Sequence, residues 1–160
     1  MKKIIILIIL LILSFSSQAQ TFKLYQTRNI HNQLRLNTKT GEVWQIQDDG
    51  LKFMVKSEIT PYNDTENRYL LQITDNIWTF ILLDRFSGKI WQCQFSASKA
   101  DEILSVPINL IELSNTNTIK YSIEPMTSMY QFYLIDDETG EMWKFQWSTK
   151  GNDYRWIEKI

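Results

Sequence analysis

Two of the residue types that most often carry chemistry are nearly absent from this sequence, which has one cysteine, Cys93, and one histidine, His31. A lone cysteine cannot form a disulfide within the chain, so the fold must be held by its hydrophobic core. A zinc site of the usual kind needs more ligands than these two residues, and a nucleophilic Cys–His pair would need Cys93 to be exposed. We therefore expect no metal and interpret Cys93 as a small buried residue.

An excess of basic charge is also missing. Lys and Arg total 17 against 18 Asp and Glu, and the basic residues do not cluster. Such a chain lacks the positive surface by which proteins bind nucleic acid or anionic lipid. The five glycines are scattered, so no phosphate-binding loop is present. Acidic runs occur only where turns are expected, whereas a glycosidase needs two facing carboxylates. We expect no enzyme activity, no cofactor and no nucleic-acid partner.

The one long apolar run stands at the start of the chain. Lys2 and Lys3 precede the apolar residues Ile4 to Leu13, and small or polar residues follow up to Ala19. This order is typical of a secretory signal peptide, residues 1–19, cleaved after Ala19. The run is about half of the roughly 20 residues that a membrane span needs. We expect a product exported to the periplasm or secreted, without membrane contact after cleavage, and formed by a single domain, residues 20–160.

Three segments of this domain align without a gap: Gln33 to Gln47, Phe80 to Gln94 and Phe132 to Gln146. Each contains an Asp or Asn, then a glycine, then a tryptophan. The acid or amide can accept bonds from backbone N–H groups of a turn, and glycine supplies the positive φ of a bulged hairpin. The expected structural turn residues are Asn37, Gly41, Asp84, Gly88, Asp136 and Gly140.

The aligned hairpins belong to three longer units, at about residues 21–58, 67–109 and 119–160. Each unit reads as four short β segments separated by turn signals. The expected strands are Phe22–Thr27, Leu34–Asn37, Glu42–Gln47 and Leu51–Lys56, then Tyr69–Thr74, Trp78–Asp84, Lys89–Phe95 and Ile103–Ile108, then Lys120–Glu124, Tyr130–Asp136, Glu141–Trp147 and Tyr154–Ile157. The fold class is therefore all-β, with three four-stranded antiparallel repeats in a pseudo-threefold arrangement.

Alternation along the strand before each turn separates two faces. One face is apolar in every copy and is expected to point to the core: Leu34 and Leu36, Ile81 and Leu83, Tyr133 and Ile135. The opposite face holds Gln33 and Arg35 in the first copy but Phe80, Leu82, Phe132 and Leu134 in the others. The first unit should thus show one face to solvent or a partner. The repeated tryptophans Trp44, Trp91 and Trp143 are expected to be core residues that pack between units.

The segment from Leu83 to Trp91, with its two relatives, resembles the blade motif of quinoprotein-type β-propellers, an Asp-x-x-Thr-Gly turn followed by a tryptophan that docks on the neighbouring blade. Here the tryptophan lies one residue nearer the glycine, and three units are fewer than the usual minimum of about four. Nothing matches a quinone site. The resemblance implies a small three-bladed, propeller-like arrangement, and a β-trefoil is the alternative.

The functional candidates follow from the repeats. His31, Trp78 and Tyr130 begin the second strand of each unit, so threefold form would bring them to one end of the domain as planar groups for a protein or a sugar. Gln33 and Arg35 mark the solvated face of the first unit. We expect a non-enzymatic module that recognises another envelope or secreted protein, as an inhibitor, an immunity-type protector or an assembly partner. The alternative is a small carbohydrate-binding module, and the chain is either a monomer or a homodimer.

Overall fold

The fold was analysed in a computed structural model of the whole chain. It describes residues 20–50, 52–56, 65–95, 104–109, 113 and 117–160. The predicted signal peptide and its cleavage site at Ala19 lie outside these residues. The described chain is all-β with one short 3-10 turn, η2 (Asn152–Tyr154), which confirms the predicted fold class.

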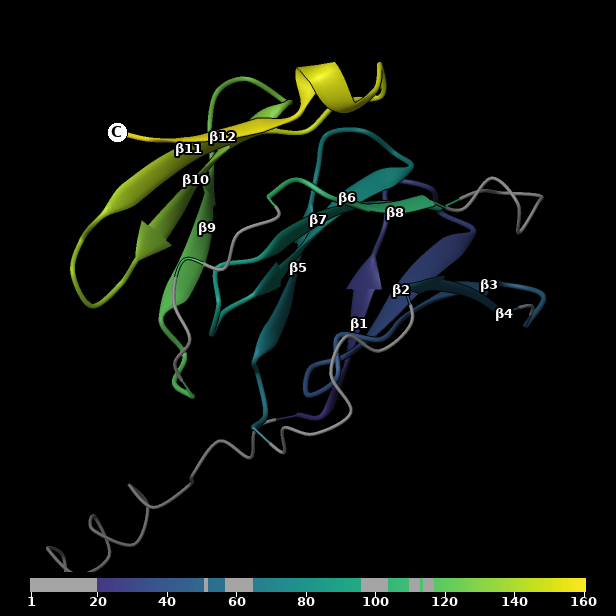
Figure 1. Cartoon of the computed structure of the whole chain (residues 1–160). Helices are drawn as coiled ribbons and strands as arrows, with labels where there is room; N and C mark the ends of the chain where they lie inside the picture. The colour runs from purple at the N-terminus through teal and green to yellow at the C-terminus, as the bar shows by residue number, and fades with distance from the viewer. Residues whose placement is uncertain (1–19, 51, 57–64, 96–103, 110–112, 114–116) are drawn as a thin grey trace, which may run out of the picture.

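The strands form three separate four-stranded antiparallel sheets, each made by one repeat (Figure 1). Within each sheet the strands lie in sequence order, so every neighbour is reached through a short connection. The first sheet contains β1 (Phe22–Gln26), β2 (Asn32–Asn37), β3 (Val43–Gln47) and β4 (Lys52–Lys56). The middle sheet contains β5 (Tyr69–Ile73), β6 (Thr79–Asp84), β7 (Ile90–Gln94) and β8 (Leu104–Pro107). The third sheet contains β9 (Tyr121–Pro125), β10 (Gln131–Asp136), β11 (Met142–Gln146) and β12 (Trp156–Lys159).

The central hairpins close as the turn chemistry predicted. Gly41, Gly88 and Gly140 have φ values of 74°, 73° and 75°. Each of these glycines donates its N–H to the carbonyl oxygen of the acid or amide four residues earlier, at 2.8 to 2.9 Å. The side chains of Asp84 and Asp136 also accept backbone N–H bonds inside their turns. Local sequence therefore determines all three hairpins.

Two hydrophobic clusters show how the sheets are layered. One cluster joins the first sheet to the middle sheet, and the other joins the middle sheet to the third. The middle sheet consequently lies between the other two, as the ribbon shows (Figure 1). All six residues of β6 are buried, because both of its faces are covered. The sheets do not close into a ring, so neither the propeller-like nor the trefoil arrangement is confirmed.

The layering corrects one prediction about the third unit. Tyr133 and Ile135 were expected to face the core, but both are only half-buried. Phe132 and Leu134, on the opposite face of β10, are buried at 3% and 0% exposure. The third sheet has one neighbouring sheet, which covers the face carrying Phe132 and Leu134.

The tryptophans follow the same logic. Trp143 is buried between the middle and third sheets, and half-buried Trp91 packs against the cluster between the first and middle sheets. Trp44 is half-buried on the outer side of the first sheet, opposite Arg35. Its assignment to the core was wrong, because no preceding sheet among the described residues covers it. Trp91 and Trp143 each pack toward the preceding sheet, and Trp44 lies on the equivalent side of the first sheet, which the described residues leave uncovered.

Ion pairs hold the first strand to the turn in the second and third units. Arg68 contacts Asp84 in the middle sheet, and Lys120 Nζ lies 2.9 Å from Asp136 Oδ2 in the third. Burial alone would raise the pKa of Asp136, but hydrogen bonds from Lys120 and from turn N–H groups lower it below its usual range. The hydrogen bond to Asp136 raises the pKa of Lys120. The Lys120–Asp136 pair is therefore charged at neutral pH.

Candidate functional site

The outer side of the first sheet exposes apolar side chains. The strand registers place ten residues on this side, and six of them form what we call the first-sheet face: Phe22, Leu24, Gln33, Arg35, Trp44 and Met54. Phe22 is 47% exposed, Leu24 63% and Met54 45%. Exposed apolar side chains gathered on one face are typical of an interaction surface, whereas single ones are not.

Sequence reasoning identified only Gln33 and Arg35 on this face, and the structure places both there, half-buried. It missed Phe22, Leu24 and Met54, which belong to the flanking strands. The alternation of Phe22, Leu24 and Gln26 along β1 was the available signal. It could not be used, because alternation alone does not say which side of a strand a neighbouring sheet covers.

Arg35 lies at the centre of the first-sheet face. Its Cζ atom is 5.4 Å from the ring centroid of Phe22 and 6.0 Å from that of Trp44. The Nε atom is buried and has no hydrogen-bond partner among the described residues. A buried donor without an acceptor costs free energy, so this guanidinium is held in place with hydrogen-bonding capacity unused.

The chemistry of this arrangement is that of carboxylate recognition. A guanidinium is a planar, permanently charged group with five N–H donors that match two carboxylate oxygens. Aromatic rings on either side orient the plane, and a cation over a ring contributes about 0.5 to 2 kcal/mol depending on desolvation. Arg35 is thus held in an orientation that suits pairing with an anionic group.

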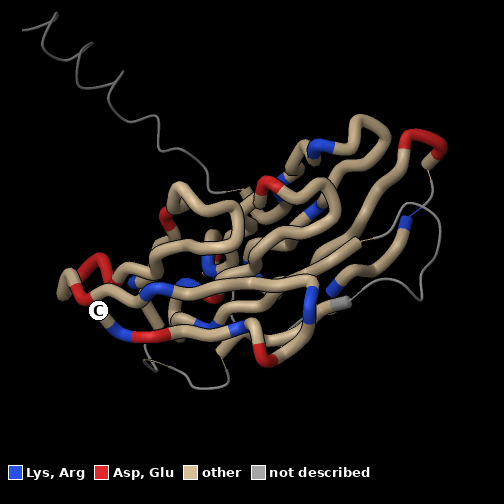
Figure 2. Tube along the Cα trace, turned by 90° about the horizontal axis from the view of Figure 1, so that it is seen from above, with Lys and Arg blue, Asp and Glu red and all other residues tan. Residues whose placement is uncertain are grey.

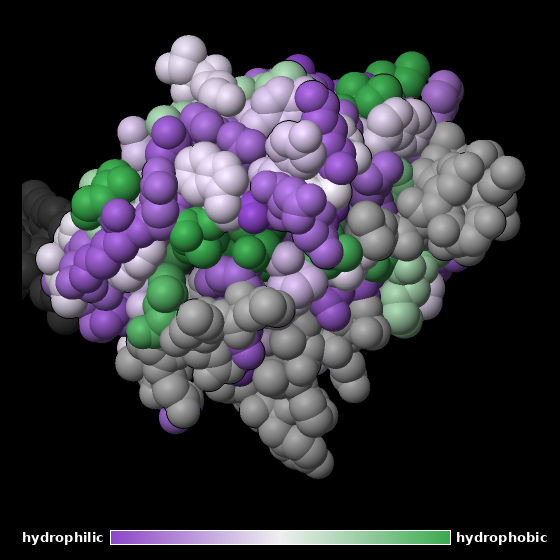
Figure 3. Space-filling model, turned by 45° about the horizontal axis from the view of Figure 1, so that its top comes forward, coloured by the Kyte–Doolittle hydropathy of each residue, from purple (hydrophilic) through white to green (hydrophobic). Residues whose placement is uncertain are grey.

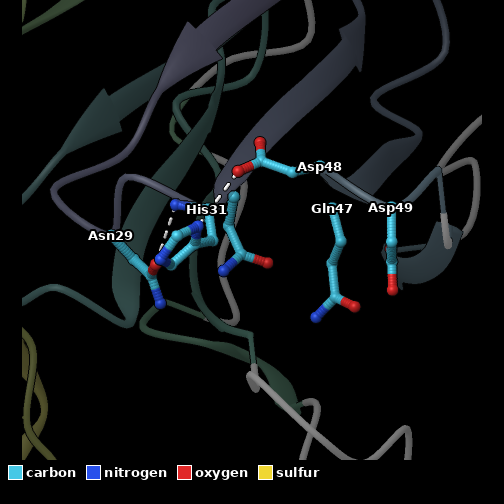
Figure 4. Close-up of a pocket in the computed structure, with 6 residues that line it drawn as sticks. Asn29, His31, Gln47, Asp48 and Asp49 are labelled. Carbon is cyan, nitrogen blue, oxygen red and sulfur yellow. Dashed lines mark hydrogen bonds and ion pairs between the residues drawn. The ribbon is translucent and has the colours of Figure 1, made fainter.

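His31 lines an open pocket of about 360 Å³ at the end of the first sheet (Figure 4). Its Nδ1 atom is 3.0 Å from Asp48 Oδ2, and its backbone N–H donates to the Asn29 side chain at 3.1 Å. In Figure 4 the side chains of Gln47, at the end of β3, and of Asp49 lie apart from the His31–Asp48 pair. Both members of that pair are mostly exposed, which gives a polar, solvated pocket.

Tyr130 lines a second pocket, of about 160 Å³, at the equivalent place in the third unit. Its ring lies 5.0 Å from the buried ring of Trp147, and it is 43% exposed. Tyr154 borders the same pocket and is 51% exposed. Gln146 Nε2 donates to the Tyr154 carbonyl oxygen at 3.1 Å, so the amide of Gln146, which also lines this pocket, is held in place.

The third planar residue, Trp78, is half-buried and packs against the core cluster, with its ring 5.5 Å from that of Phe95. The ring contacts found among the described residues join Trp78 and Tyr130 to neighbours in their own units, not to one another. His31, Trp78 and Tyr130 therefore occupy equivalent positions but have different surroundings. His31 and Tyr130 are exposed, whereas Trp78 is half-buried.

Cys93 is fully buried, as expected, and burial raises the pKa of its thiol to about 12. A thiol with so high a pKa is a poor nucleophile. Within the described ranges, no group of three or more His, Cys, Asp or Glu side chains is arranged to hold a metal ion. Basic and acidic residues are interspersed along the described chain in Figure 2.

Sequence reasoning also missed Gln92, whose side chain joins two units. Gln92 Nε2 donates to the Ser148 carbonyl oxygen at 3.0 Å, and its Oε1 accepts from Ser148 N–H and Arg155 Nε at 3.0 and 2.9 Å. This fully buried amide fastens the third sheet to the middle sheet. The signal was weak, because the glutamine that recurs in all three units lies two residues after the position of Gln92.

Comparisons with known proteins do not assign this arrangement. No protein-family model matches the chain, and no curated protein and no solved structure shows significant similarity to it. Among the described residues, no helix has the length and apolar character needed to cross a membrane. On the face drawn in Figure 3, hydrophobic side chains form small groups between hydrophilic ones. The first-sheet face and the Tyr130 pocket are the two candidate sites.

Proposed function

We propose that this chain is an exported, non-enzymatic module that binds another protein through the first-sheet face. The observation that carries the proposal is Arg35, which lies between two aromatic rings on an exposed apolar sheet face and leaves a buried donor without an acceptor. A partner that covers Phe22 and Leu24 would remove their exposed apolar surface, and a carboxylate on that partner would pair with the guanidinium charge. Arginine and aromatic residues of this kind are enriched among the energetic centres of protein interfaces.

The size and shape of the face favour a protein over a small molecule. The face spans strands β1 to β4 and is a sheet surface, whereas small ligands bind in concave sites. A stable protein interface buries about 800 Å² on each partner, so a partner would have to cover the whole face and its margins. The partner class is therefore a protein with an acidic group in an otherwise apolar docking surface.

The test is capture of partners from envelope and secreted fractions by tagged residues 20–160. We expect the wild type to capture a protein whose recovered amount falls about tenfold or more with Arg35→Glu, because the reversed charge repels the partner's carboxylate. Lys150→Gln is the matched control, since Lys150 also lies over a ring, 5.7 Å from the Tyr154 centroid, but outside the first-sheet face. Retention that does not depend on Arg35 would contradict the proposal.

A second candidate function, carbohydrate binding, is supported by the Tyr130 pocket. Exposed Tyr130 and Tyr154 line one pocket with the amide of Gln146, and flat rings beside hydrogen-bonding groups suit the apolar and hydroxyl faces of a sugar. Trp78 contributes less to this hypothesis than the sequence indicated, because it is half-buried against Phe95.

Titration with soluble oligosaccharides, followed by calorimetry and by tryptophan fluorescence from Trp147, tests this second candidate. We expect Tyr130→Ala to weaken binding about tenfold through loss of the ring contact, and Tyr130→Phe to preserve it. Equal affinities for the two variants would show that the ring does not contact the sugar. Absence of any binding to wild type would remove the candidate.

A further inference from the structure

The chain uses the same backbone contact twice to pass from one sheet to the next. The N–H of Tyr69, which begins the middle sheet, donates to the Thr38 carbonyl oxygen of the first unit at 2.9 Å. The N–H of Tyr121, which begins the third sheet, donates to the Arg85 carbonyl oxygen at 3.0 Å. Tyr69 and Tyr121 are equivalent in the repeat alignment, and so are Thr38 and Arg85. Successive sheets are therefore related by one repeated geometry.

The side-chain packing obeys the same rule. Where two sheets meet, the earlier sheet contributes the face with Leu34 and Leu36 or their equivalents, and the later sheet contributes its opposite face. The middle sheet uses both faces of β6. The faces in contact are Leu34 and Leu36 with Phe80 and Leu82, and Ile81 and Leu83 with Phe132 and Leu134. The interface is thus heterologous, because two different faces meet each time.

This rule leaves an unused face at each end of the stack. Phe22 occupies the position of Tyr69 and Tyr121, yet it is 47% exposed while each tyrosine is 1% exposed. The first-sheet face therefore has the form that receives a preceding sheet. At the other end, Asp137 occupies the position of Thr38 and Arg85, and its carbonyl would be the acceptor for a following sheet.

The outer side of the third sheet is the second unused face. The strand registers place on this third-sheet face the residues Glu124, Tyr133, Ile135, Met142, Lys144, Trp156 and Glu158. Its apolar members are half-buried and its two glutamates are exposed. Acidic residues outnumber the single lysine on this face. On the outer side of the first sheet, Arg35 and Lys52 outnumber the acidic Glu42, so the two ends are complementary in charge.

We propose that two copies of the chain associate head to tail, the third-sheet face of each on the first-sheet face of the other, to form a closed ring of six sheets. This rests on the proposed function and names a second copy as the partner. The Phe22 N–H of one copy donates to the Asp137 carbonyl oxygen of the other, repeating the internal contact. Arg35 then meets the glutamates of the third-sheet face.

The head-to-tail polarity permits a ring. A heterologous contact between two different faces makes a closed ring when the rotation closes and a filament when it does not. Rings of radially arranged four-stranded sheets usually contain about four to eight of them, so six suffice where three do not. Closure also leaves no exposed end face to bind further copies.

Sedimentation of purified residues 20–160 at micromolar concentrations tests the proposal. We expect a discrete dimer for wild type and for Lys150→Gln. Arg35→Glu, on the first-sheet face, and Tyr133→Lys, on the third-sheet face, should each be monomeric, with dimerisation weakened about a hundredfold. Circular dichroism and melting would show that both variants remain folded, so that lost association is not lost structure.

Mixing the two variants distinguishes head-to-tail contact from a symmetric one. Each variant keeps the face that the other has lost, so the mixture should regain one contact and sediment as a two-chain species.

A monomeric wild type would overturn the proposal. If that monomer still captures another protein in an Arg35-dependent way, the proposed function stands with a different partner. If it captures none, both fail. A symmetric dimer, unchanged by Tyr133→Lys, would also overturn the ring.

Discussion

Replacing Asp84 by alanine is expected to lower the free energy of unfolding by about 3 to 5 kcal/mol, because it leaves a largely buried cation without its partner. Asp84 is 2% exposed and accepts bonds from Arg68 Nε and Nη2 at 2.9 and 2.7 Å. It also accepts from Ser87 Oγ at 2.8 Å and from Phe86 N–H at 3.1 Å. Arg68 lies over the ring of Phe86 at 4.9 Å and has little access to water.

The first unit offers the matched control for this change. Asn37 stands at the equivalent position, is half-buried and accepts a single side-chain bond from Lys39 N–H, at 3.0 Å. Asn37→Ala should therefore cost about 1 kcal/mol, the usual value of one neutral hydrogen bond. Urea unfolding of both variants measures the difference, and an Arg68→Ala, Asp84→Ala double mutant isolates the pair. Equal costs at the two turns would contradict the role given to the ion pair.

Replacing Leu82 by alanine is expected to destabilise the chain by about 2 to 5 kcal/mol, because the middle sheet is covered on both faces and cannot relax into the space left. Leu82 is fully buried in the cluster between the first and middle sheets. The aligned residue in the first sheet, Arg35, lies on the uncovered first-sheet face. Arg35→Ala should cost only about 1 kcal/mol, because it removes the ring contacts of the guanidinium but leaves no enclosed cavity.

These two measurements must be separated from association, since any partner that binds only the native state raises apparent stability. Unfolding curves at two protein concentrations make that separation, because packing does not depend on concentration. We expect the Leu82→Ala loss at both concentrations. A small loss at Leu82, similar to that at Arg35, would mean that the middle sheet is not enclosed as the structure places it.

The layered stack also explains why one repeat sequence gives three different surfaces. Repeat proteins bury a continuous core by packing each unit against its neighbours, and end units usually carry a polar outer side. The first-sheet face carries Gln33 and Arg35 where the other two units have apolar residues, but Phe22 and Leu24 on the same face are apolar and exposed. An end sheet that still exposes apolar side chains is what an interface between chains requires.

The sequence by itself determined the strands and the hairpins. The turns depend on contacts within a few residues, the positive φ of Gly41, Gly88 and Gly140 and the bonds accepted by the preceding acid or amide. Alternation then determined that each strand has two faces. β6 and β10 begin one residue after their predicted starts and end where predicted, since these signals are local, whereas β12 begins two residues later than predicted, after the 3-10 turn η2.

Only the tertiary structure decided which face of each sheet is covered. Tyr133 and Ile135 on one side of β10, and Phe132 and Leu134 on the other, are all apolar, so alternation could not choose between them. The choice depends on which neighbouring sheet packs there, and that contact joins residues far apart in the chain. The same long-range packing left Trp44 on the outer side and placed Arg35 between two rings. Burial is a property of the neighbours of a residue, which local sequence does not specify.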